Sequence, residues 1–185
     1  MDEDDAKTQI LDSAYSLLSR MPYQKMSLEM VAREAGVSKA LLLYHFGSKR
    51  ELTRAALKRG FDRTMEDFTF EQELDDEMVR EILPMLFRFT HESMYLFVSY
   101  IEVIDMDPGT EDELTRLLRD MYSLFIGKLS RFLESKGDSY PREKAMLLAL
   151  AVDMIGMAHH MEGRALDLER YVNAVLDIVH VEVGA

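Results

Sequence analysis

Apolar residues recur at three- and four-residue spacing along nearly the whole chain, a pattern that predicts helices. The first predicted helix ends at Pro22 and carries one apolar stripe: Ile10, Leu11, Ala14, Leu17, Leu18 and Met21. Further helices are predicted over about 48–68, 74–89 (interrupted or kinked at Pro84), 94–101, 110–135, 141–163 and 167–183. No segment shows the alternation of a half-buried strand. Together with two short helices between residues 27 and 46, these segments predict an all-α fold of about nine helices.

Residues 27–46 have the features of a helix-turn-helix motif. Ser27 can cap a first short helix and Ser38 a second. Between them, Gly36 occupies the turn, where a positive φ is easily adopted only by glycine. Gly47 ends the second helix, and Ser48 with Glu51 forms a capping box that starts the next one. The pattern therefore predicts a DNA-reading motif followed directly by a long, continuous helix.

The same segment resembles the N-terminal domain of TetR-family transcriptional regulators. The residues that match without a gap are Ala32, Gly36, Val37, Ser38, Leu42, Tyr44, His45, Phe46, Lys49 and Leu52. The match covers roughly residues 6–64. It implies a helix-turn-helix DNA-binding domain over residues 4–64 and a helical ligand-binding and dimerisation domain over residues 65–185. It also implies a homodimer that binds a double-stranded DNA operator.

The second helix of the motif is the predicted reading helix. Leu42 and Phe46 lie at i and i+4 and are expected to point inward. The candidate DNA-binding residues are Ser27, Ser38, Lys39, Ala40, Leu41, Leu43, Tyr44, His45 and Lys49. Three of them depart from the family pattern, since Leu43 replaces an aromatic residue, Ala40 a glycine and Leu41 a polar residue. We therefore expect base reading to depend on apolar contacts with thymine methyl groups.

Charge divides along the chain in a way that fits this assignment. The formal net charge is -12, but residues 6–60 contain ten lysines and arginines and only four acidic residues, a net of +6. Residues 61–185 carry a net of -14. Phosphates would attract the first segment and repel the second, although a mixed, solvated surface is the alternative interpretation.

The last two predicted helices are apolar on more than one side, which predicts that a second copy covers the side left over. A monomer with a central buried helix is the alternative. The predicted dimer interface, a four-helix bundle, consists of Ala149, Val152, Gly156, Val172, Val175, Leu176 and Val179. A two-fold dimer would place two reading helices about 34 Å apart.

Fourteen methionines and nine phenylalanines are the second unusual feature of the composition. Flexible thioethers suit a cavity that adapts to its contents. Because the resemblance implies an effector pocket, we expect a hydrophobic small molecule there, although plain core is the alternative role for these residues. The predicted ligand-binding residues are Met85, Phe89, Met94, Phe97, Met121, Phe125, Met154 and Met157.

Other classes of chemistry have little support in the sequence. There is no cysteine, and no G-x-S-x-G or H-E-x-x-H motif, so we expect neither an enzyme nor a cofactor. Adjacent helical residues such as His159 and His160 point about 100° apart, so no metal site is expected. No apolar run reaches the length of a membrane span, and we expect a cytoplasmic protein that makes no membrane contact. A helical adaptor that binds protein through the motif is the competing hypothesis.

Overall fold

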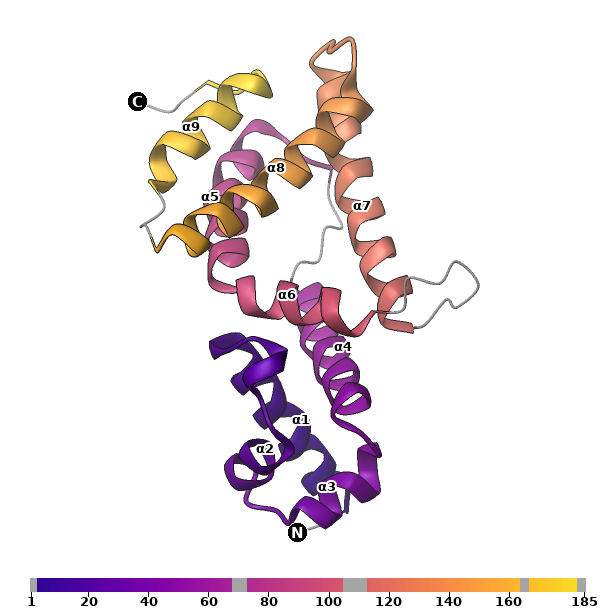
Figure 1. Ribbon diagram of the computed structural model, residues 1–185. Helices are drawn as coiled ribbons and strands as arrows, with labels where there is room; N and C mark the ends of the chain where they lie inside the picture. Colours follow the sequence, from indigo (N-terminus) through magenta and orange to yellow (C-terminus); the bar gives the residue numbers. More distant parts are fainter. Residues whose placement is uncertain (1–2, 68–72, 105–112, 164–166, 183–185) are drawn as a thin grey trace. The chain divides into compact units, whose positions relative to one another are not determined.

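The computed structural model describes residues 3–67, 73–104, 113–163 and 167–182 (Figure 1). Over these residues the chain forms nine α-helices, a short 3-10 turn and no strand, which confirms the all-α prediction. The elements are α1 (Glu3–Arg20), η1 (Tyr23–Lys25), α2 (Leu28–Glu34), α3 (Lys39–Phe46), α4 (Lys49–Asp67), α5 (Asp76–Glu92), α6 (Met94–Val103), α7 (Glu113–Ser135), α8 (Pro141–Glu162) and α9 (Leu168–Ile178).

The helices fall into two compact units. The first unit contains Met1–Thr69 and Tyr95–Arg119, and the second contains Phe70–Met94 and Asp120–Ala185. The domain bounds expected from the sequence, 4–64 and 65–185, remain a prediction. The grouping by contacts differs from them because it adds α6 and the first turns of α7 to the N-terminal helices.

In the first unit, α1 packs along α4, and α2 and α3 pack across α1. The side chains that fill the space between them are Ile10, Ala14, Leu17, Leu18, Val31, Leu42, Leu52, Ala56, Leu57 and Phe61. Gly60 permits the closest approach, because a Cβ atom at this position would lie 1.9 Å from Cε2 of Tyr15. The apolar stripe predicted before Pro22 is therefore the face that braces the motif.

The core of the second unit lies where α5 packs against α8 and α9. Its buried side chains include Val79, Leu83, Phe87, Leu129, Phe132, Leu133, Leu148, Val152, Val172, Val175 and Leu176. Pro84 lies inside α5, which nevertheless extends as one helix beyond it.

The predicted last helix is shorter than the sequence pattern indicated. It was expected to reach residue 183, but α9 ends at Ile178. His180 adopts a φ of 60°, and the backbone N–H of Val181 returns to donate to the carbonyl of Leu176 at 2.9 Å. The apolar residues after Ile178 thus continue the core without continuing the helix, since Val179 and Val181 are both buried.

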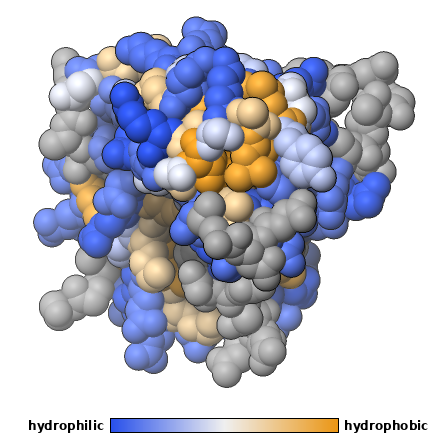
Figure 2. All heavy atoms as spheres, turned by 90° about the horizontal axis from the view of Figure 1, so that it is seen from below, coloured by the Kyte–Doolittle hydropathy of each residue, from blue (hydrophilic) through white to orange (hydrophobic). Residues whose placement is uncertain are grey.

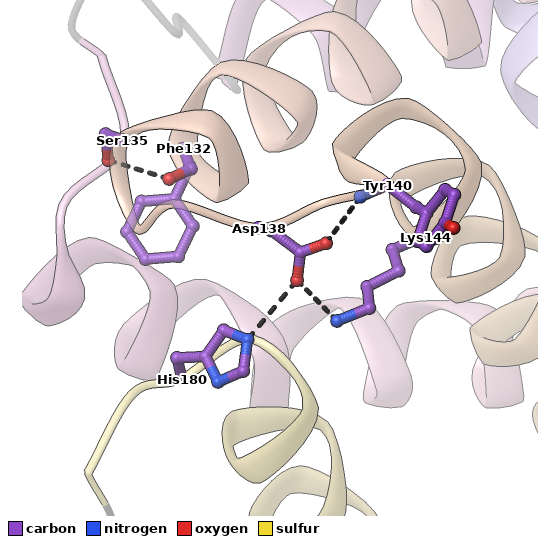
Figure 3. Close-up of polar contacts among 6 residues, drawn as sticks. All are labelled: Phe132, Ser135, Asp138, Tyr140, Lys144 and His180. Carbon is purple, nitrogen blue, oxygen red and sulfur yellow. Dashed lines mark hydrogen bonds and ion pairs between the residues drawn. The ribbon is translucent and has the colours of Figure 1, made fainter.

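Asp138, in the turn between α7 and α8, connects this turn to the residues that follow α9 (Figure 3). Its carboxylate accepts hydrogen bonds from Lys144 Nζ, from the backbone N–H of Tyr140 at 2.9 Å and from His180 Nε2 at 3.2 Å. The side chain is only 2% exposed. The Lys144 ammonium, followed by the Tyr140 amide, lowers the pKa of Asp138 to about 2.

Candidate functional site

The helix-turn-helix has the local geometry that its sequence predicts. The Ser27 hydroxyl accepts a hydrogen bond from the amide of Met30 at 3.2 Å, and the Ser38 hydroxyl accepts one from Leu41 at 3.1 Å. Gly36 adopts a φ of 66°, as the turn requires. Both hydroxyls satisfy amides at a helix start, so Ser27 and Ser38 orient α2 and α3.

The orientation of α3 follows from Leu42, which is completely buried. Helical spacing then places Lys39, Ala40, Leu43 and Tyr44 on the outer face, and all four are exposed. Tyr44 is the most exposed of them, at 76%. Figure 2, seen from below the view of Figure 1, shows hydrophobic residues bordered by hydrophilic ones. The outer face of α3 combines an extended aromatic side chain, aliphatic groups and a cation, the types of group that contact base edges and phosphates.

The remaining predicted DNA-binding side chains are less freely exposed. Leu41 is half-buried, and His45 is half-buried with Nε2 enclosed and without a partner among the described residues. Lys49 Nζ lies 4.0 Å from the centre of the Tyr23 ring. Partial burial lowers the pKa of Lys49, against the opposing effect of Glu102.

Lys39 has a partner within the motif. Its Nζ forms an exposed ion pair with Glu29 on α2, and the hydrogen bond from Lys39 lowers the pKa of the Glu29 carboxyl. The pair spans the two helices of the motif. A phosphate that binds Lys39 would therefore compete with Glu29.

A set of polar contacts between α4 and α6 could not be expected from the sequence. Arg50 Nη2 and Arg54 Nη1 donate hydrogen bonds to the carbonyl of Val103, at 3.1 and 3.0 Å. This carbonyl belongs to the last turn of α6, where backbone acceptors have no partner within the helix. The only sequence signal is the i, i+4 spacing of the two arginines, which does not identify an acceptor 49 residues away along the chain.

Two contacts of the η1 turn reinforce this connection. The backbone N–H of Tyr23 donates to the buried Ser99 hydroxyl at 3.0 Å, and Gln24 Nε2 donates to Glu102 Oε1 at 2.7 Å. Ser99 and Glu102 both belong to α6. We call the contacts that Tyr23, Gln24, Arg50 and Arg54 make with α6 the α6 clasp, and they join this helix to the elements that carry the reading helix.

The predicted ligand-binding residues differ widely in exposure. Met85 and Met154 are exposed, Met94 is buried, and the other five are half-buried, with Phe97 in the first unit. The second unit contains a small cavity of about 30 Å³, with room for about one water molecule. Its lining is entirely apolar: Leu74, Val79, Ile82, Leu83, Leu86, Phe125, Leu129, Leu148, Val152, Val175 and Val179. Phe125 is the one predicted ligand-binding residue among them.

The predicted dimer-interface residues lie in the interior of their own unit. All seven are buried in the protomer: Ala149, Val152, Gly156, Val172, Val175, Leu176 and Val179. A Cβ atom at Gly156 would lie 3.0 Å from Thr90 Oγ1 on α5, so this glycine permits close packing within the chain. The apolar side chains that α8 and α9 expose are different ones: Met146, Leu147, Leu150, Met154, Met161 and Ile178.

The remaining polar candidates form structural contacts. His159 Nε2 lies 3.1 Å from the Tyr171 hydroxyl, and the His91 and His160 rings pack edge to face. In the described part of the chain, no group of three or more histidine, aspartate or glutamate side chains could hold a metal ion. None of the helices in that part is long and apolar enough to cross a membrane.

Comparison with known proteins relates the N-terminal helices to a family of bacterial regulators. The sequence profile of bacterial regulatory proteins of the tetR family matches residues 10–56. The negative transcriptional regulator IcaR of the biofilm operon icaADBC from Staphylococcus epidermidis is 21% identical over 145 residues, which are 78% of each chain.

Two solved structures share the fold. A tetR-family transcriptional regulator from Streptomyces coelicolor superposes with a TM-score of 0.75 at 18% identity, over 98% of this chain and 82% of its own. A transcriptional regulator from Saccharomonospora viridis, solved in complex with choline, superposes with a TM-score of 0.71 at 20% identity, over 96% of both chains. The matching residues 10–56 comprise most of α1, the helix-turn-helix and the first turns of α4. Residues 10–56 therefore form a DNA-binding domain of the tetR family of bacterial regulatory proteins, and the chain shares the fold of solved tetR-family regulators.

Proposed function

We propose that the chain is a homodimeric repressor that binds a palindromic operator through α3 and is released from it by a hydrophobic small molecule. The observation that carries this proposal is the outer face of α3, where Tyr44, Leu43 and Ala40 are exposed in a DNA-binding family. Repression has support from the IcaR relatives, which are negative regulators.

In the proposed complex, α3 enters the major groove. Ala40, Leu41 and Leu43 contact thymine methyl groups, and Lys39, Tyr44, His45 and Lys49 contact phosphates or base edges. Ser27 and Ser38 position the starts of α2 and α3 against the DNA backbone. The net charge of +6 on residues 6–60 favours docking through this segment.

The proposed dimer uses the exposed side of α8 and α9 instead of the side predicted from the sequence. Leu147, Leu150, Met154 and Met161 recur along α8 at three-, four- and seven-residue spacing, so they form one stripe. A second copy is the proposed occupant because a two-fold arrangement pairs this stripe with itself and supplies two reading helices.

Release of the protein from DNA by an effector requires a binding site that can open. The apolar cavity in the second unit holds about one water molecule, so a larger apolar ligand would have to separate the surrounding helices. The neighbour solved with choline supports a small-molecule site in this fold. The α6 clasp offers a route by which a displaced α6 would move α4 and the reading helix.

A fluorescence-anisotropy titration tests the proposal. The purified chain is titrated against labelled DNA from upstream of its own gene, with scrambled DNA as competitor, at two salt concentrations. We expect salt-sensitive binding that survives the competitor. Binding no tighter than that to scrambled DNA would assign the operator elsewhere, and no binding at low salt would favour the protein-binding adaptor.

A further inference from the structure

Asp153, near the middle of α8, is a carboxylate placed in an apolar setting. Its Oδ2 accepts a hydrogen bond from the Tyr122 hydroxyl of α7, and the side chain is half-buried. Burial raises the pKa of Asp153, and the Tyr122 hydrogen bond only partly opposes this effect. The surroundings of Asp153 therefore disfavour its ionised form, because they supply too few polar groups to stabilise the charge.

No cationic side chain in the described part of the chain lies within ion-pair distance of Asp153. Other acidic residues of this protein do have such partners. Asp12 lies 3.0 Å from both Arg59 and Arg63, and Asp138 pairs with Lys144. A half-buried carboxylate without a cation is unfavourable for folding, and an asparagine would accept the same hydrogen bond without the charge.

Apolar residues lie one helical turn from the pair on each helix. On α8, Met157 lies one turn after Asp153, and on α7 Phe125 and Ile126 lie one turn after Tyr122. A ligand that reaches the carboxylate would thus contact thioether, aliphatic and aromatic side chains along its length. Such a combination suits a molecule with an apolar body and one positive charge.

We propose that Asp153 and Tyr122 recognise the positive charge of a lipophilic cation, such as an alkylammonium compound, and that this cation is the effector. The inference rests on the proposed function, since it names the ligand class of the proposed regulator. The bound cation would supply the missing partner of the carboxylate, and the Tyr122 ring would add a cation–π contact. The ionised carboxylate would repel a fatty acid anion.

The test compares three eight-carbon probes by isothermal titration of the full-length chain: octyltrimethylammonium, 1-octanol and octanoate. We expect the cation to bind at least about tenfold more tightly than the alcohol, and octanoate to bind most weakly. The variant Asp153→Asn keeps the acceptor for Tyr122 and removes the charge. It should bring the cation and the alcohol to within about twofold of each other.

Asp120→Asn is the matched control, because Asp120 is an exposed acid on α7 and its replacement changes the net charge equally. This control should retain the preference for the cation. Thermal unfolding of Asp153→Asn should show a stability equal to or above that of the parent chain, so that a lost preference cannot come from misfolding.

Equal binding of cation and alcohol by the parent chain would overturn the inference, as would a preference that survives in Asp153→Asn, or no binding of any probe. The DNA titration described above separates the two proposals. If the chain binds its operator but shows no preference for the cationic probe, only the proposed ligand class is wrong. If it binds no DNA, the proposed function is wrong, whichever probe binds.

Discussion

At the scale of single residues, Gly36 has a backbone requirement that can be measured. Its φ of 66° is unfavourable for any residue with a Cβ atom, although a Cβ there would meet nothing within 4 Å. Gly36→Ala should therefore lower the free energy of unfolding by about 1–2 kcal/mol through backbone strain alone. Urea denaturation measures this change.

Gly127 provides the matched control for Gly36. It lies within α7, and a Cβ atom would come no closer than 3.6 Å to a neighbouring side chain. Gly127→Ala should raise the free energy of unfolding by up to about 1 kcal/mol, because alanine favours helix more than glycine does. If Gly36→Ala raises the free energy of unfolding as Gly127→Ala does, the turn geometry at Gly36 is wrong.

Asp138 makes the stability depend on pH at the acid end. Its pKa is about 2 in the folded chain and 3.8 is the ordinary value, so the unfolded chain binds more protons between these limits. The stability that Asp138 contributes is complete above about pH 4 and is lost as the pH falls toward 2. Asp138→Asn should lower stability at pH 7 and flatten this part of the profile.

The profile is measured by thermal unfolding between pH 2 and pH 7. Asp177→Asn removes an exposed acid of α9 and should leave the slope between pH 4 and pH 2 unchanged. If the stability of Asp138→Asn fell between pH 4 and pH 2 as steeply as that of the parent chain, Lys144 and His180 would not stabilise the ionised form of Asp138.

At the scale of helices, the close packing of α1 on α4 depends on Gly60. Gly60→Ala would place a methyl group in the Tyr15 ring, so we expect a loss of about 1–3 kcal/mol from overpacking. In a Tyr15→Ala background the added methyl has space, and the same substitution should cost little or stabilise α4. An equal cost in both backgrounds, measured by urea denaturation, would contradict this packing.

Local signals explain why the helix-turn-helix could be predicted from the sequence. Ser27, Gly36 and Ser38 act on backbone groups within a few residues, and Leu42 identifies the inner face of α3 through spacing alone. These features do not depend on distant partners. Their positions in the structure confirm the predicted motif, while the contacts with DNA remain a proposal.

Periodicity cannot indicate which apolar face of a helix meets which neighbour. The two apolar sides of α8 were recognised, but Val152 and Gly156 were assigned to a second copy, whereas they pack against α5 of the same chain. The same limit applies to the roles of the methionines and to the α6 clasp, where residues 49 to 78 positions apart along the chain meet. Each of these contacts depends on how helices pack rather than on local sequence.

At the scale of the whole molecule, the exposed stripe on α8 should determine the oligomeric state. Leu150 is 49% exposed, and Leu150→Asp would place a charge at the centre of the proposed dimer interface. We expect this variant to sediment as a monomer at concentrations where the parent chain is a dimer. Analytical ultracentrifugation measures the difference.

Leu124 on α7 is the matched control, since it is a leucine of similar exposure, 41%. Leu124→Asp should remain a dimer. A monomeric parent chain would contradict the proposed assembly, and a dimeric Leu150→Asp variant would place the interface on another surface.

The central claim is that the outer face of α3 binds DNA, and Tyr44 tests it most directly. Tyr44 is 76% exposed, and Tyr140, at the start of α8 in the second unit, is 67% exposed. Neither side chain stabilises a core, so each can be replaced by alanine with little effect on folding. The measurement is the anisotropy titration of operator DNA with both variants. We predict that Tyr44→Ala weakens binding at least about tenfold while Tyr140→Ala binds like the parent chain; equal affinities for the two variants would contradict the assignment of α3 as the reading helix.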